Sequence, residues 1–135
     1  MGNCKENKIS KESAEISFES FLDYYDIDKE DLTDEEKLPF EQGKRRIIKA
    51  IRTGRLEITI DDKLVITQNV KGGQTIEYQE VTGKAKMEMD KEKGNYGKVY
   101  ALLGSLSGLG GGAFKKLSGK DLSLAETLGA VFLLV

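Results

Sequence analysis

The sequence predicts a small α+β domain in which a short antiparallel β-meander is packed by helices and the C-terminal half is helical. Residues 56–81 alternate apolar and polar side chains in three short runs separated by turn residues, which is typical of a meander. Residues 95–135 carry apolar side chains at helical spacing on both sides of a glycine-rich linker. With 135 residues, of which 39% are hydrophobic, the chain is long enough for one domain with a modest core.

Charge is unevenly distributed along the chain, although the formal net charge is only −2. Residues 1–43 carry 13 acidic and 5 basic groups, whereas residues 44–55 carry 6 basic groups and no acidic one. We therefore expect a partly ordered acidic N-terminal arm at residues 1–38, followed by a single domain at residues 39–135. An acidic arm beside a basic helix can fold back on it or be displaced from it by a partner.

The first residues are similar to a lipidation signal but depart from it. Gly2 and Cys4 suit N-myristoylation and palmitoylation, yet Glu6 occupies the position where a myristoylation signal has Ser or Thr. An unmodified, disordered terminus with an exposed thiol is the simpler interpretation.

Two short helices are expected within the acidic arm. Apolar side chains at helical spacing in residues 13–27 indicate an amphipathic helix. Thr33 and Glu36 have the spacing of a capping box, which predicts a one-turn helix that ends at Pro39. The acidic residues 26–31 lack the glycine and the closing glutamate of a calcium loop, so we interpret them as a solvated linker.

The strongest electrostatic feature is a basic helix predicted at residues 39–54. Pro39 suits a first helical position, because its missing N–H would be unpaired there, and Gly54 suits a left-handed cap. Such a helix can bind a nucleic-acid backbone or an acidic protein surface, or it can be a solvated face beside the acidic arm. It contains no aromatic residue between its basic residues to stack on bases. The basic side chains around its apolar stripe are Lys44, Arg45, Arg46, Lys49, Arg52 and Arg55.

The β-meander is predicted to span residues 56–90. Residues 56–60 and 64–70 form an expected hairpin, and residues 75–81 form a third strand after a Gly-Gly turn. Residues 84–90 continue the alternation, which favours a fourth strand over the start of a helix. Strands with one apolar face need helical cover, which the basic helix and the C-terminal helices can supply.

Residues 95–135 are predicted to form a helical pair. The glycine run at 108–112 follows a helix at 96–106 and lacks the lysine and hydroxyl of a P-loop, so we interpret it as a linker and not as a phosphate site. Ser118 and Asp121 have the spacing of a helix start. The last two turns are apolar almost all round, which indicates burial on more than one face, either within the chain or against a partner or second copy.

The residue types present leave little chemistry for a catalytic or metal site. The chain has no histidine and a single cysteine, which exclude a disulfide framework and a structural zinc site. The other titratable and hydroxyl residues show no catalytic spacing, so we expect no catalytic, metal or cofactor site and a protein that is not an enzyme. No apolar stretch approaches the roughly 18 residues of a membrane span. We therefore expect a cytoplasmic protein in a reducing compartment.

The C-terminal half carries a family resemblance. Residues 98–108 cover most of the helix expected at residues 96–106 and the Leu-Ser-Gly turn after it, residues 114–121 contain Leu-Ser-Gly-Lys-Asp, and the last helix ends on bulky apolar residues. This order, together with the basic helix-to-strand junction at residues 50–56, resembles the tail assembly chaperones of long-tailed bacteriophages. In that family a strand-rich first half precedes a helix, a turn and an apolar last helix. The resemblance covers residues 56–135.

The resemblance implies a non-enzymatic protein, made in the bacterial host, that binds the tape-measure protein until tail-tube subunits assemble around it. The apolar last helix would offer a surface for amphipathic helices, and the basic helix would offer an electrostatic contact. Two alternatives stay open: a structural protein of the phage tail or head–tail junction, and a nucleic-acid-binding accessory protein that uses the basic helix. The residues expected to bind the partner are Leu124, Leu128, Val131, Phe132, Arg45, Arg46 and Lys49.

Overall fold

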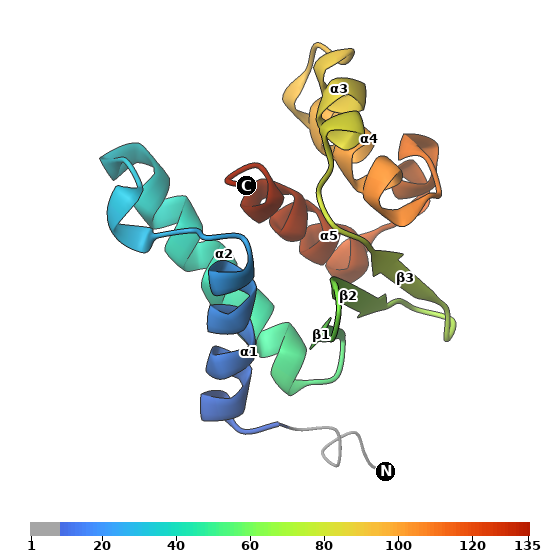
Figure 1. Cartoon of the computed structure of the whole chain (residues 1–135). Helices are drawn as coiled ribbons and strands as arrows, with labels where there is room; N and C mark the ends of the chain where they lie inside the picture. The colour runs from blue at the N-terminus through green and yellow to red at the C-terminus, as the bar shows by residue number, and fades with distance from the viewer. Residues whose placement is uncertain (1–8) are drawn as a thin grey trace.

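The computed structural model describes residues 9–135 and confirms the α+β class, with a three-stranded antiparallel sheet and a helical C-terminal half (Figure 1). Gly2 and Cys4, on which the lipidation-like signal falls, lie outside the described residues. Within residues 9–135, none of the helices has the length and apolarity needed to span a bilayer. The elements are α1 (Lys11–Tyr24), the 3-10 helix η2 (Lys29–Asp31), α2 (Asp34–Arg52), β1 (Leu56–Ile60), β2 (Leu64–Asn69), β3 (Thr75–Tyr78), α3 (Gly83–Asp90), α4 (Asn95–Ser107), the 3-10 helix η3 (Gly111–Lys116) and α5 (Gly119–Phe132).

The sheet is a meander in the order β1-β2-β3 with one face toward the core. In its middle, Ile58 lies opposite Ile66, which in turn lies opposite Tyr78. The alternation in the sequence selects this face, because successive side chains of a strand point to opposite sides. α4 packs on β3 and α2 packs on β1, so helices supply the cover that the apolar face needs.

A buried polar network fixes the start of α5 on this sheet. The Gln68 side-chain amide is fully buried and donates to the backbone carbonyl of Asp121 at 2.9 Å. Its oxygen accepts a hydrogen bond from the Tyr78 hydroxyl at 2.7 Å. The Asp121 carboxylate accepts from the backbone N–H of Lys71 at 2.9 Å. Because a buried amide is costly unless it is hydrogen-bonded, the network favours one position of α5 on the sheet.

Part of the segment that we expected to be a partly ordered arm belongs to the core. α1 forms where the apolar spacing predicted a helix, and its Phe18, Phe21 and Leu22 are buried. Phe21 contacts Phe132 of α5 edge to face, with ring centres 5.9 Å apart. The core therefore includes residues that precede the expected boundary at residue 39.

α2 begins at Asp34, before the expected start at Pro39. The predicted capping box is present: the Thr33 hydroxyl accepts from the backbone N–H of Glu36 at 3.2 Å, and the Glu36 carboxylate accepts from the backbone N–H of Thr33 at 2.9 Å. The helix does not end at Pro39 but continues through it. Pro39 removes one backbone hydrogen bond, but the first turns of α2 are exposed, so water can reach the carbonyl that is left free.

Residues 84–90 form α3 and not the fourth strand that their alternation predicted. Thr82 caps this helix, because its hydroxyl accepts from the backbone N–H of Ala85 at 3.1 Å. Ala85 and Met89 are four residues apart and pack on the core, whereas Met87 is 70% exposed. In so short a run, alternating apolar residues fit both the strand and the helix periodicity. The segment adopts the helix, which packs against α4.

The glycine run after α4 is a tight turn that folds back onto that helix. Gly108 ends α4 in the left-handed conformation, with a φ of 75°. The backbone N–H of Gly110 then donates to the carbonyl of Gly104 at 3.1 Å. A Cβ on Gly104 would lie 2.3 Å from the carbonyl carbon of Gly110 and from the nitrogen of Gly111. The close approach requires glycine, so the predicted linker is a packed turn.

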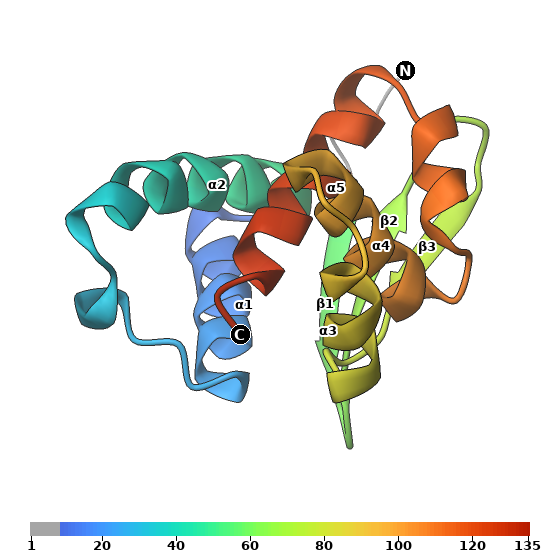
Figure 2. The same cartoon turned by 90° about the horizontal axis from the view of Figure 1, so that it is seen from above.

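α5 packs against both α2 and α4 and is buried on most of its circumference (Figures 1 and 2). Gly43 of α2 faces Thr127, and Gly129 of α5 faces Val99 of α4. Small residues at the two crossings let the helices approach closely. The apolar C-terminal helix is thus covered within the chain, which is one of the two explanations that the sequence left open.

Gly104→Ala is expected to lower the free energy of unfolding by about 1–3 kcal/mol, because the added methyl group overpacks a contact between two backbone segments. Gly112→Ala is the matched control, since no heavy atom lies within 4 Å of its Cβ position. Urea denaturation of the two variants measures the difference. A Gly104→Ala variant as stable as the control would contradict the tight turn.

Alkaline unfolding is expected to depend on Tyr78. Burial raises the pKa of its hydroxyl above the ordinary value of 10. As the pH rises above about 10, the unfolded chain loses this proton first, so stability that is fully present below that pH declines. Tyr78→Phe should flatten the decline, and should cost about 1–3 kcal/mol at neutral pH because the buried Gln68 oxygen loses its donor. Urea titrations across this pH range test both effects; an unchanged alkaline slope would show that Tyr78 is not responsible.

Candidate functional site

The four apolar residues predicted to bind a partner lie in the core. Leu124, Leu128, Val131 and Phe132 are each at most 4% exposed. Phe132 lies between aromatic rings of α1 and β3, with ring centres 5.9 and 6.2 Å away. These side chains therefore hold α5 in place and are covered by the chain itself, so they are not exposed to a partner.

The three basic residues of the prediction are exposed but face different sides of α2. Arg46 lines a groove between α2 and α5, whereas Arg45 and Lys49 line a groove between α1 and α2. The structure thus does not bring them into one site. Of the seven predicted contact residues, Arg46 and Val131 line the groove between α2 and α5.

The groove between α2 and α5, here called the α2/α5 groove, has a volume of about 580 Å³. Its rim includes the exposed Pro39 and Ala130, and Leu133, which is 47% exposed. Tyr96 in the first turn of α4 is 69% exposed and lines the same groove. The polar residues that line it are Glu35, Glu36, Gln42, Arg46, Ser123, Glu126 and Thr127.

The position of the α2/α5 groove explains why its rim is apolar and open. The N-terminal half of α2 extends away from the sheet, and the C-terminal end of α5 lies beside this half of α2 (Figure 1). When another apolar surface covers such exposed apolar side chains, binding is favoured by about 25 cal/mol of free energy for each Å² removed from water. An exposed apolar area rimmed by polar groups is a typical protein-binding surface.

The groove between α1 and α2, here called the α1/α2 groove, has a volume of about 510 Å³ and is basic. Glu15 and Glu41 are the acidic residues that line it. No ion pair joins its basic residues to another residue within 9–135. The basic residues are Lys11, Lys44, Arg45, Lys49 and Arg52.

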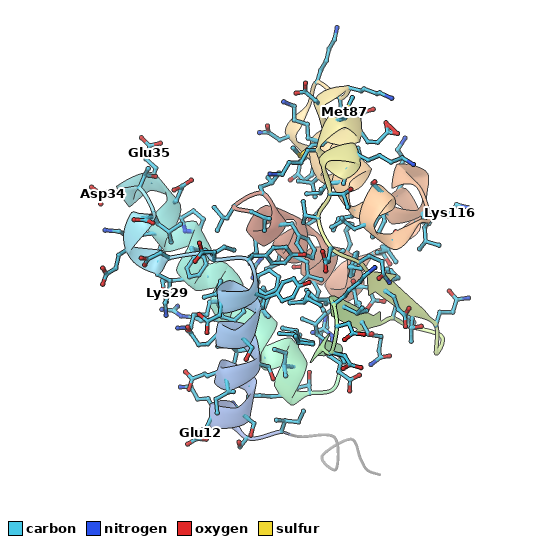
Figure 3. All side chains as sticks on the ribbon, in the orientation of Figure 1. Glu12, Lys29, Asp34, Glu35, Met87 and Lys116 are labelled. Carbon is cyan, nitrogen blue, oxygen red and sulfur yellow. The ribbon has the colours of Figure 1, made fainter. Side chains whose placement is uncertain are left out.

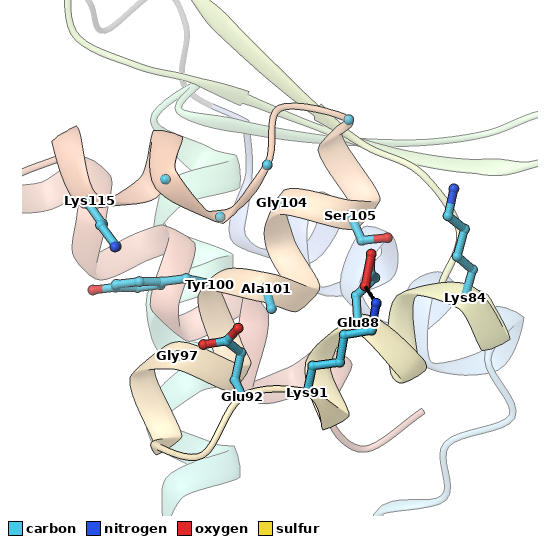
Figure 4. A pocket seen from close by; sticks show the side chains of 14 residues that line it. Lys84, Glu88, Lys91, Glu92, Gly97, Tyr100, Ala101, Gly104, Ser105 and Lys115 are labelled. Atoms are coloured by element: carbon cyan, nitrogen blue, oxygen red, sulfur yellow. Dashed lines mark ion pairs between the residues drawn. The ribbon is translucent and has the colours of Figure 1, made fainter.

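A third cavity, of about 540 Å³, lies beside the glycine turn (Figure 4). Three lysines and two glutamates line it, and Lys91 forms an ion pair with Glu88 at 2.8 Å. The hydrogen bond from Lys91 holds the pKa of the Glu88 carboxyl below its ordinary value. On the other side of the cavity, Lys115 points toward Tyr100 (Figure 4). Because the carboxylates offset most of the lysine charge and the glycines serve packing, we assign no ligand to this cavity.

Hydrogen bonds between elements shift the pKa values of two tyrosines. The Tyr100 hydroxyl donates to Glu126 at 2.8 Å, and this hydrogen bond raises the pKa of Tyr100. Tyr24 donates to Glu80, which raises the pKa of Tyr24 in the same way. These bonds join α4 to α5 and α1 to the segment after β3. Residues 9–135 contain no group of three or more side chains placed to hold a metal ion.

Sequence reasoning missed most of the α2/α5 groove. Pro39, Tyr96 and Ala130 come together only through tertiary packing of segments that are distant in the sequence. The one available signal was Leu133, which widens the apolar stripe of the last helix beyond what a single buried face needs.

Leu128→Ala is expected to lower the free energy of unfolding by about 2–5 kcal/mol, because it opens a cavity in the core. Leu133→Ala should cost less than about 1 kcal/mol, because this side chain is half exposed. Urea denaturation compares the two variants. Equal losses would mean that the assignment of core and rim is wrong.

Comparison with known proteins adds no relative to this description. No protein-family model matches the chain, and neither the curated proteins nor the solved structures contain a significant match. A function for this chain is therefore proposed below from its sequence resemblance and from its surfaces.

Proposed function

We propose that this protein is a tail assembly chaperone of a long-tailed bacteriophage, and that it binds the tape-measure protein through the α2/α5 groove during tail morphogenesis. The observation that carries the proposal is the groove itself. It combines exposed apolar side chains with charged residues at its edge, beside the end of the apolar C-terminal helix.

An amphipathic helix is the partner that this groove fits best. Leu133, Tyr96 and Pro39 can cover one apolar stripe of such a helix, with contacts every third or fourth residue. Glu35, Glu36 and Arg46 at the edge can pair with the charged residues that flank the stripe. A tape-measure protein, which the sequence resemblance implies as the partner, is long and prone to aggregation, so transient cover of its apolar helices would keep it available for assembly.

The segments that carry the family resemblance are placed in a way that supports this function. Leu106, Ser107 and Gly108 end α4, and Ser118 to Asp121 begin α5. The segments therefore serve to position α5, whose last turn borders the groove. The proposed function is non-enzymatic and is carried out in the cytoplasm of the bacterial host.

The test is capture of tagged protein from cells that express the surrounding gene cluster, with bound proteins identified by mass spectrometry before and after nuclease treatment. We expect recovery of one very long, helix-rich protein that does not depend on nucleic acid. Leu133→Glu should reduce this recovery by about tenfold or more, because it places a charge against the apolar stripe of the partner helix. Leu109→Glu is the matched control, because Leu109 is 56% exposed and lies outside the α2/α5 groove.

Two results would replace the proposal with one of its alternatives. Nuclease-sensitive recovery, lost when Arg45, Arg46 and Lys49 are replaced together by Ala, would indicate a nucleic-acid-binding accessory protein. Presence of the protein in purified virions would indicate a structural component of the tail or head–tail junction.

A further inference from the structure

The outward face of α2 has an acidic end and a basic end. α1 and α5 pack on the other side of this helix, which is about 28 Å long at 1.5 Å per residue (Figure 2). Figure 3 shows Asp34 and Glu35 projecting from its free N-terminal end. Exposed side chains at spacings of three and four residues form one row, here called the outward stripe, which consists of Asp34, Leu38, Glu41, Arg45, Lys49 and Arg52. The last four of these also line the α1/α2 groove, so the stripe borders that groove.

The outward stripe is complementary to itself when a second helix runs antiparallel. Residue 43 lies midway between Asp34 and Arg52, and also midway between Glu41 and Arg45. Two antiparallel α2 helices whose outward stripes face each other, and whose midpoints lie at the level of residue 43, therefore place both acidic residues of each stripe opposite basic residues of the other. We propose that two copies of this chain associate through the outward stripe in this antiparallel arrangement. A twofold axis repeats every contact, so each matched pair occurs twice.

The side chains needed for this contact are accessible. Glu41 and Arg45 form no ion pair with another residue within 9–135. Asp34 contacts Lys37 at 3.4 Å, but the Asp34 side chain is 99% exposed, so its carboxylate can accept a second partner. Leu38 is 65% exposed and falls next to Lys49 of the other copy, whose aliphatic stem can cover it.

The association is weak and depends on salt, because exposed ion pairs contribute little individually and the stripe is mostly polar. The α2/α5 groove borders another side of α2, at Pro39, Gly43 and Arg46, and remains open in the dimer. Each dimer thus presents two grooves, which would bind a long partner with several similar helices more tightly than one groove does. The inference goes beyond the proposed function and does not depend on it, since it concerns the purified chain alone.

The test is sedimentation velocity of the purified full chain over a range of concentrations at low and high salt. We expect a monomer–dimer equilibrium at ~10 mM salt that is lost at ~1 M, where the screening length falls from about 30 Å to about 3 Å. Arg45→Glu should weaken the dimer by roughly tenfold or more, because two attractive pairs become repulsive. The double variant Glu41→Arg/Arg45→Glu should restore the dimer, because the two substituted side chains again carry opposite charges and face each other between the copies.

Each possible result of this test either supports the proposed dimer or rules it out. Circular dichroism first checks that each variant is folded. A monomer at every concentration and salt would overturn the proposal. So would a dimer that persists in the Arg45→Glu variant, because it would use another face, and so would failure of the double variant to restore association. Recovery of the tape-measure protein in the capture experiment is read separately, so the two proposals can fail independently.

Discussion

The fold depends on the burial of α5 against both α2 and α4. This helix is apolar almost all round, so it is stable only if neighbours cover most of its surface. Two glycines let the neighbouring helices approach α5 closely: Gly43 on α2 faces Thr127, and Gly129 on α5 leaves room for Val99. The buried amide of Gln68 then fixes the start of the helix through the carbonyl of Asp121. With the helix held in this way, Ala130 and Leu133 at its C-terminal end stay in contact with water beside α2.

α2, which packs against α5, also carries surfaces of different chemical character on its different sides. One edge of α2 borders the α2/α5 groove with Pro39 and Arg46, while the opposite edge borders the basic α1/α2 groove with Lys44. The outward stripe, whose charges change sign along the helix, runs along the outer side of this second groove, which Glu41, Arg45, Lys49 and Arg52 also line. Acidic residues near the N-terminus and basic residues near the C-terminus also suit the helix dipole, so the arrangement stabilises α2 itself. A single element can therefore serve folding, partner binding and self-association on different faces.

Local chemistry made much of the fold predictable from the sequence. Alternation in residues 56–78 identified the sheet, and the Thr33–Glu36 capping box identified the start of a helix. The errors arose where a short pattern fits two structures. Residues 84–90 satisfy both strand and helix periodicity, and the structure distinguishes them by burying Ala85 while leaving Met87 exposed. Pro39 was expected to begin a helix, but the capping box already starts the helix five residues earlier, at Asp34.

The candidate site was less predictable for a related reason. An apolar stripe shows which residues avoid water but not what covers them, so Leu128 and Phe132 could belong to a core or to an interface. The fold places them in the core and leaves Leu133, one residue beyond the end of α5, at the rim. Tyr96 also lies at this rim, although it belongs to α4 and is separated from Leu133 by a long segment of the sequence.

An NMR titration of the isotopically labelled chain with helical fragments of the tape-measure protein from the same gene cluster would locate the binding surface residue by residue. Backbone amide shifts are expected to change first at Arg46, Tyr96, Ala130 and Leu133, which surround the α2/α5 groove. Shift changes confined to the exposed face of the sheet or to α3, or no change at saturating fragment, would contradict the assignment of this groove as the binding surface.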